Sequence, residues 1–273
     1  MKLLLTGASG FIGTHIGATL TAAGHEVMVA TRSAGLDFNQ LREPADWQPH
    51  LTGIEAVINC VGIIAERHDQ SFTTLHYHAP AALFRACVEV GVTRVIQISA
   101  LGADERASTP YQTSKKAADD VLRRLPLDWF VLRPSLVYGP GGKSTALFRR
   151  LASLPVIPLV DRGQQMIQPV HVDDLVAAVL TCLTTQLTCQ TIDVVGPNAI
   201  TFADWIQQLR RQNGKPLATI VSVPYSLARL VAPLAHYLIP LLTADNLRML
   251  QQGNTADVQP LVNLLGSSPR AVP

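Results

Sequence analysis

Two side chains one helical turn apart could exchange protons with a bound molecule. Tyr111 and Lys115 stand at positions i and i+4 of a segment, residues 110–124, that begins with proline and is predicted to be helical. A phenol that works near neutral pH needs its pKa lowered by about three units, or about 4 kcal/mol. A cation about 4 Å away supplies a similar amount at an effective dielectric constant near 20. We therefore expect Lys115 to lower the pKa of Tyr111, and both are candidate catalytic residues.

A glycine-rich turn near the start of the chain could hold a diphosphate. Residues 6–13 read Thr-Gly-Ala-Ser-Gly-Phe-Ile-Gly, follow a predicted strand and open a predicted helix. In this pattern the first glycine makes the tight turn, the second admits a pyrophosphate and the third lets helix pack on strand. A turn that only packs tightly is the alternative. The residues predicted to hold the diphosphate are Gly7, Ser9, Gly10, Phe11, Ile12 and Gly13.

The residue at the end of the second predicted strand bears on which dinucleotide is bound. A site for NAD(H) places Asp or Glu there, whereas this chain has Arg32. A guanidinium pairs with a 2′-phosphate, so Arg32, helped by Ser9, predicts NADP(H), and NAD(H) is kept as the alternative cofactor. An arginine that contacts only water is the other interpretation.

The elements that must position these residues alternate along the chain. Short apolar runs at residues 3–6, 27–31, 56–61, 94–99 and 129–132 are separated by amphipathic segments, including residues 11–23, 72–90 and 110–124. This alternation predicts an α/β fold, a doubly wound parallel sheet of the Rossmann type. We also expect a short strand near Leu36 and a helix over residues 45–51.

Beyond residue 140 the predicted elements shorten. We expect helices over residues 144–154, 173–183 and 201–214, and strands over 166–171 and 191–195. This pattern divides the chain into a dinucleotide-binding core, residues 1–140, and a small mixed carboxyl-terminal lobe, residues 141–273, with strands returning to the core sheet.

Six groups of residues together resemble the short-chain dehydrogenase/reductase superfamily in its extended or atypical branch, which includes NAD-dependent epimerases and dehydratases. They are the glycine turn, Asn59-Cys60-Val61-Gly62, Ser99, the Tyr111/Lys115 pair, the loop from Leu132-Arg133-Pro134 to Gly139-Pro140, and Val170-His171-Val172-Asp173-Asp174. The tail, from residues 242–254 to 264–270, is similar to that of the nucleotide-binding accessory subunit of respiratory complex I and its bacterial relatives.

The resemblance implies a role for each of these groups. Tyr111 would be the acid or base, Lys115 would also hold the nicotinamide ribose, and Ser99 would orient a substrate carbonyl. Cys60, Val61 and Gly62 would line the adenosine side of the cofactor, and Pro134 to Val137 the nicotinamide. Family members that act on sugar nucleotides carry the working hydroxyl about two residues after Ser99, where this chain has Leu101. Ser108 and Thr109 are alternative hydroxyls.

Composition excludes several other classes of protein. The formal net charge is +2, and no basic stripe interleaved with aromatic residues indicates a nucleic-acid partner. The scattered cysteines and His68, His76 and His78 predict no metal site. The segment 225–242 is apolar, and burial beneath the lobe is favoured over contact with a membrane face. The opening residues 2–5 are expected to be a strand rather than a signal segment, so a cytoplasmic location is expected. The oligomeric state is expected to be a monomer or a homodimer.

Three functions remain open on these observations. The favoured one is an NADP(H)-dependent oxidoreductase that acts on a small carbonyl or alcohol. The second is a non-catalytic NADPH-binding structural or assembly factor for a respiratory or quinone-synthesis complex, with a quinone-like ligand among its candidate partners. The third is a nucleotide-sugar epimerase or dehydratase, which Leu101 and the compact carboxyl-terminal region disfavour.

Overall fold

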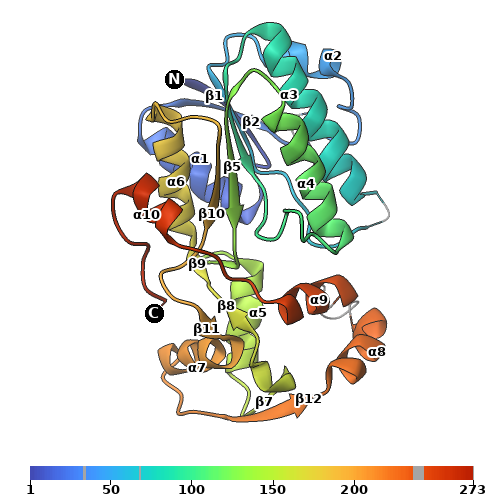
Figure 1. Cartoon of the computed structure of the whole chain (residues 1–273), viewed down its shortest axis with the longest axis vertical. Coiled ribbons are helices and arrows are strands. Elements are labelled where there is room, and N and C mark those ends of the chain that lie inside the picture. Colours follow the sequence, from blue (N-terminus) through green and yellow to red (C-terminus); the bar gives the residue numbers. More distant parts are fainter. Residues whose placement is uncertain (33–34, 68, 236–242, 273) are drawn as a thin grey trace.

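The centre of the protein is a parallel sheet of six strands. The computed structural model describes residues 1–32, 35–67, 69–235 and 243–272. The strands lie in the order β10-β5-β4-β3-β1-β2 and every neighbouring pair is parallel (Figure 1). Their bounds are β1 Lys2–Thr6, β2 Glu26–Ala30, β3 Ala56–Asn59, β4 Arg94–Ile98, β5 Asp128–Pro134 and β10 Gln190–Val194. Such buried strands need apolar side chains on both faces, which explains the continuous Leu, Val and Ile runs.

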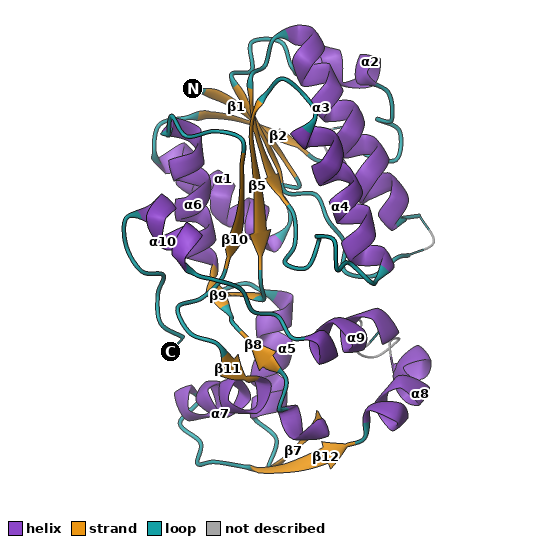
Figure 2. Cartoon of the chain, viewed as in Figure 1, coloured by secondary structure: helices purple, strands orange, loops and turns teal. Residues whose placement is uncertain are grey.

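Helices cover both faces of this sheet (Figure 2). On one face pack α1 (Phe11–Ala22), α6 (Val172–Thr184) and α10 (Gln259–Leu265), with Ile16, Leu175 and Leu261 in the shared core. On the other pack α2 (Pro44–Trp47), α3 (Ala79–Val90) and α4 (Pro110–Arg123), with Trp47, Phe84 and Leu122. The doubly wound Rossmann sheet predicted from the sequence is therefore confirmed.

Two details near the sheet differ from expectation. The short strand predicted near Leu36 is wrong, because the described residues 35–43 form no strand and instead turn inward. Leu36, Phe38 and Leu41 are buried there against Trp47, whose indole donates to the Leu41 carbonyl at 3.1 Å. The helix predicted over residues 72–90 is present, but it begins with a π-helical turn, Thr73–His78, ahead of α3.

The lobe is a second small core below the sheet. It contains α5 (Lys143–Ala152), β7 (Val156–Val160), a 3₁₀ turn (Asp161–Gly163), β8 (Met166–Ile167), β11 (Ile200–Thr201), α7 (Phe202–Gln212), β12 (Thr219–Val223), α8 (Tyr225–Ala235) and α9 (Ala244–Gln252). Trp205, Phe202 and Ile157 fill its centre. The parallel pair β7 and β12 was not predicted, because each strand has only five residues and neither sequence, VIPLV nor TIVSV, alternates between apolar and polar residues.

Several elements beyond residue 140 belong to the core rather than to the lobe. The expected strand over 166–171 is broken at Gln168 and Pro169 into β8, in the lobe, and β9 (Val170–His171), which pairs with β6 (Val137–Tyr138). From β9 the chain enters α6, and β10 then pairs with β5 at the edge of the sheet. The domain boundary at residue 140 stays a prediction.

Candidate nucleotide-binding and catalytic site

The glycine turn lies where the winding of the sheet reverses. β1 lies between β2 and β3, and the helices that follow β1 and β3 pack on opposite faces of the sheet, which is the position at which doubly wound folds bind ligands. Gly7 follows β1 with φ +67°, and a Cβ there would lie 2.7 Å from the Cys60 carbonyl carbon, after β3. A Cβ on Gly13 would lie 2.2 Å from the Gly7 carbonyl oxygen. Two of the three glycines are thus required by backbone packing alone.

Gly10, the second glycine of the turn, leaves the start of α1 open to an anion. Gly10 is the N-cap in extended backbone, and no side chain caps the helix. The first amides of α1, at Phe11, Ile12 and Gly13, then carry the positive end of the helix dipole without a carboxylate or hydroxyl to occupy it. This geometry fits the diphosphate of a dinucleotide.

Arg32 is exposed next to the loop that follows β3. Its Nη1 lies 3.6 Å from Asp69 Oδ2, and both side chains are about two-thirds exposed. Such a pair is screened by water and contributes little to stability. The guanidinium therefore remains accessible to a ligand phosphate, although the Asp69 carboxylate would oppose one.

Lys115 fastens the loop after β3 to helix α4. Its ammonium donates to the carbonyls of Val61 at 3.0 Å and Ile98 at 3.1 Å, and its side chain is buried. Burial lowers the pKa of Lys115 to about 8, while the nearby Asp119 and Cys60 act in the opposite direction. A Cβ on Gly62 would lie 3.0 Å from the ammonium. The structure therefore brings Lys115 together with Cys60, Val61 and Gly62, the predicted cofactor loop.

Tyr111 packs in an aromatic cluster one turn before Lys115. Its ring centroid lies 5.8 Å from that of Phe72 and 5.4 Å from that of His76, both in edge contacts. Burial, with the Asp119 charge second, raises the pKa of Tyr111 to about 12. The expectation that Lys115 lowers this pKa is therefore wrong for this arrangement, because the ammonium is directed to the two backbone carbonyls.

His76, for which no role was predicted, also connects the loop after β3 to helix α4. The Ile63 amide donates to His76 Nε2 at 3.0 Å, so the proton belongs on Nδ1, which lies 3.0 Å from Ser114 Oγ. That serine donates in turn to the Tyr111 carbonyl at 2.9 Å. Burial, followed by the Lys115 charge, lowers the pKa of His76 to about 2. His76 is therefore a neutral link between the cofactor loop and α4.

Ser99 directs its hydroxyl into the core. Ser99 Oγ donates to Asp119 Oδ2 at 2.5 Å, and both residues are buried. Burial raises the pKa of Asp119 to about 6, against the opposing effects of the Ser99 hydrogen bond and the Lys115 charge. The assignment of Ser99 to a substrate carbonyl stays a prediction, and in this arrangement its hydroxyl already has a strong acceptor.

A row of buried polar residues leads across the sheet toward Asp119. Thr6, Asn59 and Gln97 stand in register on β1, β3 and β4. Thr6 Oγ1 donates to Asn59 Oδ1 at 2.5 Å, and Asn59 Nδ2 donates to Gln97 Oε1 at 2.7 Å. The side-chain nitrogen of Gln97 has no hydrogen-bond acceptor among the described residues. The Gln97 amide group nevertheless acts to lower the pKa of Asp119. Polar residues ending otherwise apolar strands could have marked this row in the sequence, and Asp119 lies one helical turn after Lys115.

The two alternative hydroxyls also have structural partners. Thr109 caps α4, accepting from the Gln112 amide at 3.3 Å, and is buried. Ser108 Oγ accepts from Gln252 Nε2 at 2.7 Å, which ties α9 of the lobe to the loop that precedes Tyr111. Leu101 donates its amide to the Pro134 carbonyl at 2.9 Å.

The predicted nicotinamide loop, from Pro134 to Val137, is held from three sides. Ser135 Oγ donates to the Gln168 carbonyl at 2.6 Å, and Val137 pairs with Val170. The Leu136 amide donates to Asn254 Oδ1 at 3.0 Å, so the tail fixes this loop from the lobe side. The tail, whose resemblance to the complex I subunit stays a prediction, therefore contacts the predicted nicotinamide loop.

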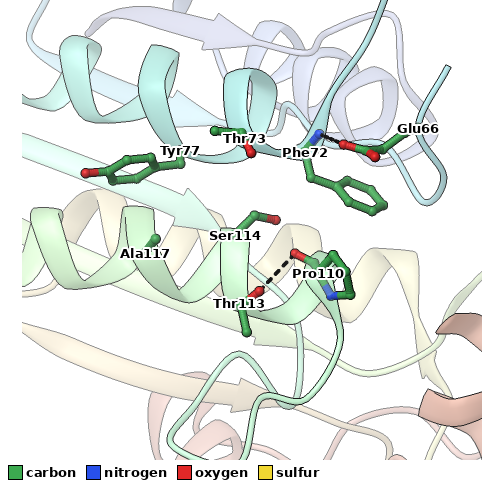
Figure 3. A pocket seen from close by; sticks show the side chains of 8 residues that line it. All are labelled: Glu66, Phe72, Thr73, Tyr77, Pro110, Thr113, Ser114 and Ala117. Carbon is green, nitrogen blue, oxygen red and sulfur yellow. Dashed lines mark hydrogen bonds between the residues drawn. The ribbon is translucent and has the colours of Figure 1, made fainter. Parts of the chain in front are cut away.

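A cleft of about 370 Å³ lies close to Tyr111, which is not among its lining residues. Figure 3 shows the residues that line it. It opens between the π-helical turn with α3 and helix α4. Its lining residues are Glu66, Phe72, Thr73, Tyr77, Pro110, Thr113, Ser114 and Ala117. It shares Phe72 and Ser114 with the surroundings of Tyr111, and the glycine turn is on other elements.

The remaining candidate ligands do not converge. Among the described residues no three His, Cys, Asp or Glu side chains gather as a metal site would require. His68, named in the sequence analysis, lies outside the described residues. Helices in the described part of the chain also lack the combination of length and apolar content that a bilayer crossing requires.

The doubly wound sheet, the uncapped glycine turn at its switch point and the α4 lysine that donates to the loop after β3 define a Rossmann protein of the nicotinamide-dinucleotide class. The chain belongs to the NAD dependent epimerase/dehydratase family, whose model matches residues 3–194. This confirms the resemblance to the extended branch of the superfamily.

The chain is similar in sequence to two proteins with different names, a reductase and a subunit of a respiratory complex. The chain is 28% identical over 185 residues to the ceramide reductase of Caulobacter vibrioides, covering 63% of this chain and 58% of that protein. It is 27% identical over 187 residues to mouse mitochondrial NADH dehydrogenase [ubiquinone] 1 alpha subcomplex subunit 9, covering 62% of this chain and 49% of that one. The chain therefore spans only about half the length of these two relatives.

Solved structures confirm the fold. UDP-glucuronic acid 4-epimerase from Bacillus cereus, in complex with UDP-glucuronic acid and NAD, superposes with a TM-score of 0.73 at 20% identity, covering 99% of this chain and 95% of that one. MoeE5 in complex with UDP-glucuronic acid and NAD gives 0.71 at 21% identity, covering 99% and 94%.

Proposed function

We propose that this protein is an NADP(H)-dependent oxidoreductase that acts on a small carbonyl or alcohol. The observation that carries the proposal is the hydrogen bond from Lys115 Nζ to the Val61 carbonyl. It joins the helix that bears Tyr111 to the loop after β3, which itself contacts the glycine turn at Gly7. The glycine turn and the Lys115 ammonium therefore lie at the carboxyl-terminal ends of the central strands, and Tyr111 is one helical turn before that lysine.

In this proposal, different residues bind the cofactor and transfer the proton. When bound, the nicotinamide would supply or accept the hydride. The amides of Gly10 to Gly13 would hold the diphosphate, and Lys115 would bind the ribose hydroxyls near Val61. Tyr111 holds its phenol proton firmly in this arrangement, because burial keeps its pKa near 12. Such a phenol suits the acid role in carbonyl reduction better than the base role in alcohol oxidation.

The Arg32 and Asp69 pair offers a matched test of cofactor choice. Arg32→Asp should weaken NADPH binding about ten-fold or more and leave NADH binding nearly unchanged, because a charge-assisted contact is lost. Asp69→Asn should strengthen NADPH binding several-fold, because it removes a carboxylate 3.6 Å from the guanidinium. Titration calorimetry with both nucleotides measures this, and equal effects on NADPH and NADH would refute the NADP(H) preference.

Catalysis is tested separately from binding. Tyr111→Phe should abolish carbonyl reduction and leave NADPH affinity within about two-fold, because the ring contacts with Phe72 and His76 are retained. A panel of small ketones and aldehydes with NADPH, followed by absorbance, gives the readout. Turnover that survives in Tyr111→Phe would remove the phenol from the reaction.

A specific observation also favours a second candidate, a non-catalytic NADPH-binding factor for a respiratory or quinone-related assembly. Ser99, Ser108 and Thr109, the three hydroxyls considered for a substrate carbonyl, each already have a hydrogen-bond partner within the protein. The similarity to the complex I subunit agrees with this reading. Tight NADPH binding with no oxidation by any carbonyl in the panel would favour it.

A further inference from the structure

Helix α8 has apolar side chains on two sides. Ala228 and Ala232 face inward, where they pack with Leu247 of α9. Leu227, Leu230 and Val231 recur at helical spacing on the other side and are 49%, 76% and 41% exposed. A surface helix of a globular protein carries polar residues there, so this second apolar stripe is not explained by folding.

The strand pair β7 and β12 also has apolar side chains that are exposed. In β7 and β12, Pro158 and Val221 are partners and both are exposed, as is Val156, whereas Ile157 and Leu159 point into the lobe. Figure 1 places both strands at the end of the lobe farthest from the central sheet. Leu217, which leads into β12, is 67% exposed. One end of the lobe thus carries apolar side chains on successive elements.

Positive charge accompanies this surface. Residues 205–244 contain no aspartate or glutamate, although the whole chain has 20 acidic residues against 22 lysines and arginines. Arg211, Lys215 and Arg229 lie in this stretch and are exposed. Lys215 donates to the Ser153 carbonyl at 3.0 Å, which places its charge beside Leu154, itself 42% exposed.

We propose that this surface docks on an anionic lipid bilayer. We call it the basic apolar face and define it by Arg211, Lys215, Leu217, Val221, Leu227 and Leu230. Exposed leucines can enter the boundary between headgroups and acyl chains, and adjacent cations are attracted to anionic lipids. A second copy of the chain is the poorer partner, because a two-fold contact would bring the same cations together.

Vesicle binding tests the proposal with matched variants. The purified full chain should bind vesicles of phosphatidylcholine mixed with phosphatidylglycerol, bind phosphatidylcholine alone far more weakly, and be released by salt. Leu230→Ser should lower the affinity about ten-fold. Leu187→Ser is its control, because Leu187 is 74% exposed in the loop between α6 and β10.

A second pair of variants tests the charges. Arg211→Ser with Lys215→Ser should lower the affinity about thirty-fold, at about 1 kcal/mol for each cation. Arg106→Ser with Arg124→Ser, two exposed cations on the core, should leave it unchanged. Circular dichroism and thermal unfolding verify that each variant is folded.

Three outcomes would overturn the proposal. They are no binding of the wild-type chain to the mixed vesicles, equal losses in Leu230→Ser and Leu187→Ser, and concentration-dependent dimers, seen by light scattering, that Leu230→Ser abolishes while vesicle binding persists. NADPH affinity is measured in parallel. The proposal does not rest on the oxidoreductase function, and neither result decides the other.

Discussion

Ser99 Oγ donates to Asp119 Oδ2 across 2.5 Å in the buried space between β4 and α4. The charge of the same carboxylate raises the pKa of Lys115 against the larger effect of burial. Asp119 therefore supports the charged state of a residue that holds the cofactor loop.

The first prediction concerns this support. Asp119→Asn should move the pH at which Lys115 loses its proton below about 8, because burial would then act with less opposition. NADPH affinity should consequently begin to fall at a lower pH than in the wild type. Titration calorimetry between pH 6 and 9 measures the shift. Identical pH profiles would show that Asp119 has no influence on nucleotide binding.

The second prediction concerns Ser99. Ser99→Ala leaves a buried carboxylate without its donor, which should cost about 1–3 kcal/mol of stability. NADPH affinity should change little, since Ser99 contacts Asp119 rather than the glycine turn. Urea unfolding and nucleotide titration supply the two readouts. A stable variant that has lost only turnover would instead support the substrate-orienting role.

The third prediction separates packing from anion binding in the glycine turn. Gly13→Ala should unfold the turn and abolish NADPH binding, because its Cβ would stand 2.2 Å from the Gly7 carbonyl oxygen. In Gly10→Ala the nearest atom is 3.2 Å away, so the fold should survive while NADPH binding weakens. Thermal unfolding and calorimetry distinguish the two. Unimpaired NADPH binding by folded Gly10→Ala would contradict the cradle.

The fourth prediction is a pH dependence from His76. Its pKa falls from 6.5 unfolded to about 2 folded, so below pH 6.5 the unfolded chain binds more protons, and stability is lost as pH falls. Asp119, with its pKa raised to about 6, acts oppositely between about pH 4 and 6. His76→Gln removes only the first effect.

The His76→Gln variant keeps a donor and an acceptor for Ser114 and Ile63. As the pH falls from 7 to 5, the free energy of unfolding of the wild type should drop by about 2 kcal/mol more than that of the variant. The slope is about 1.4 kcal/mol per pH unit below pH 6.5. Urea unfolding of both proteins at several pH values gives the difference. A stability difference independent of pH would show that His76 is not the buried neutral group inferred from its contacts.

Local sequence was sufficient for the Rossmann sheet and its glycine turn. Apolar runs such as residues 94–99 suit strands buried on both faces, and Gly7, Gly10 and Gly13 have the spacing that turn, ligand approach and packing require. The Tyr111 and Lys115 spacing placed both on one helix, which α4 confirms. These features depend on residues within a few turns of one another.

Tertiary structure alone decided what those residues face. Lys115 was expected to act on Tyr111, but carbonyls of residues 61 and 98, distant in sequence, receive its hydrogen bonds. Ser99 likewise donates to Asp119, 20 residues away in the sequence. The Leu136 amide donates to Asn254, which is 118 residues away. Side-chain direction in a buried site depends on which polar partners satisfy each group, and sequence spacing does not encode those partners.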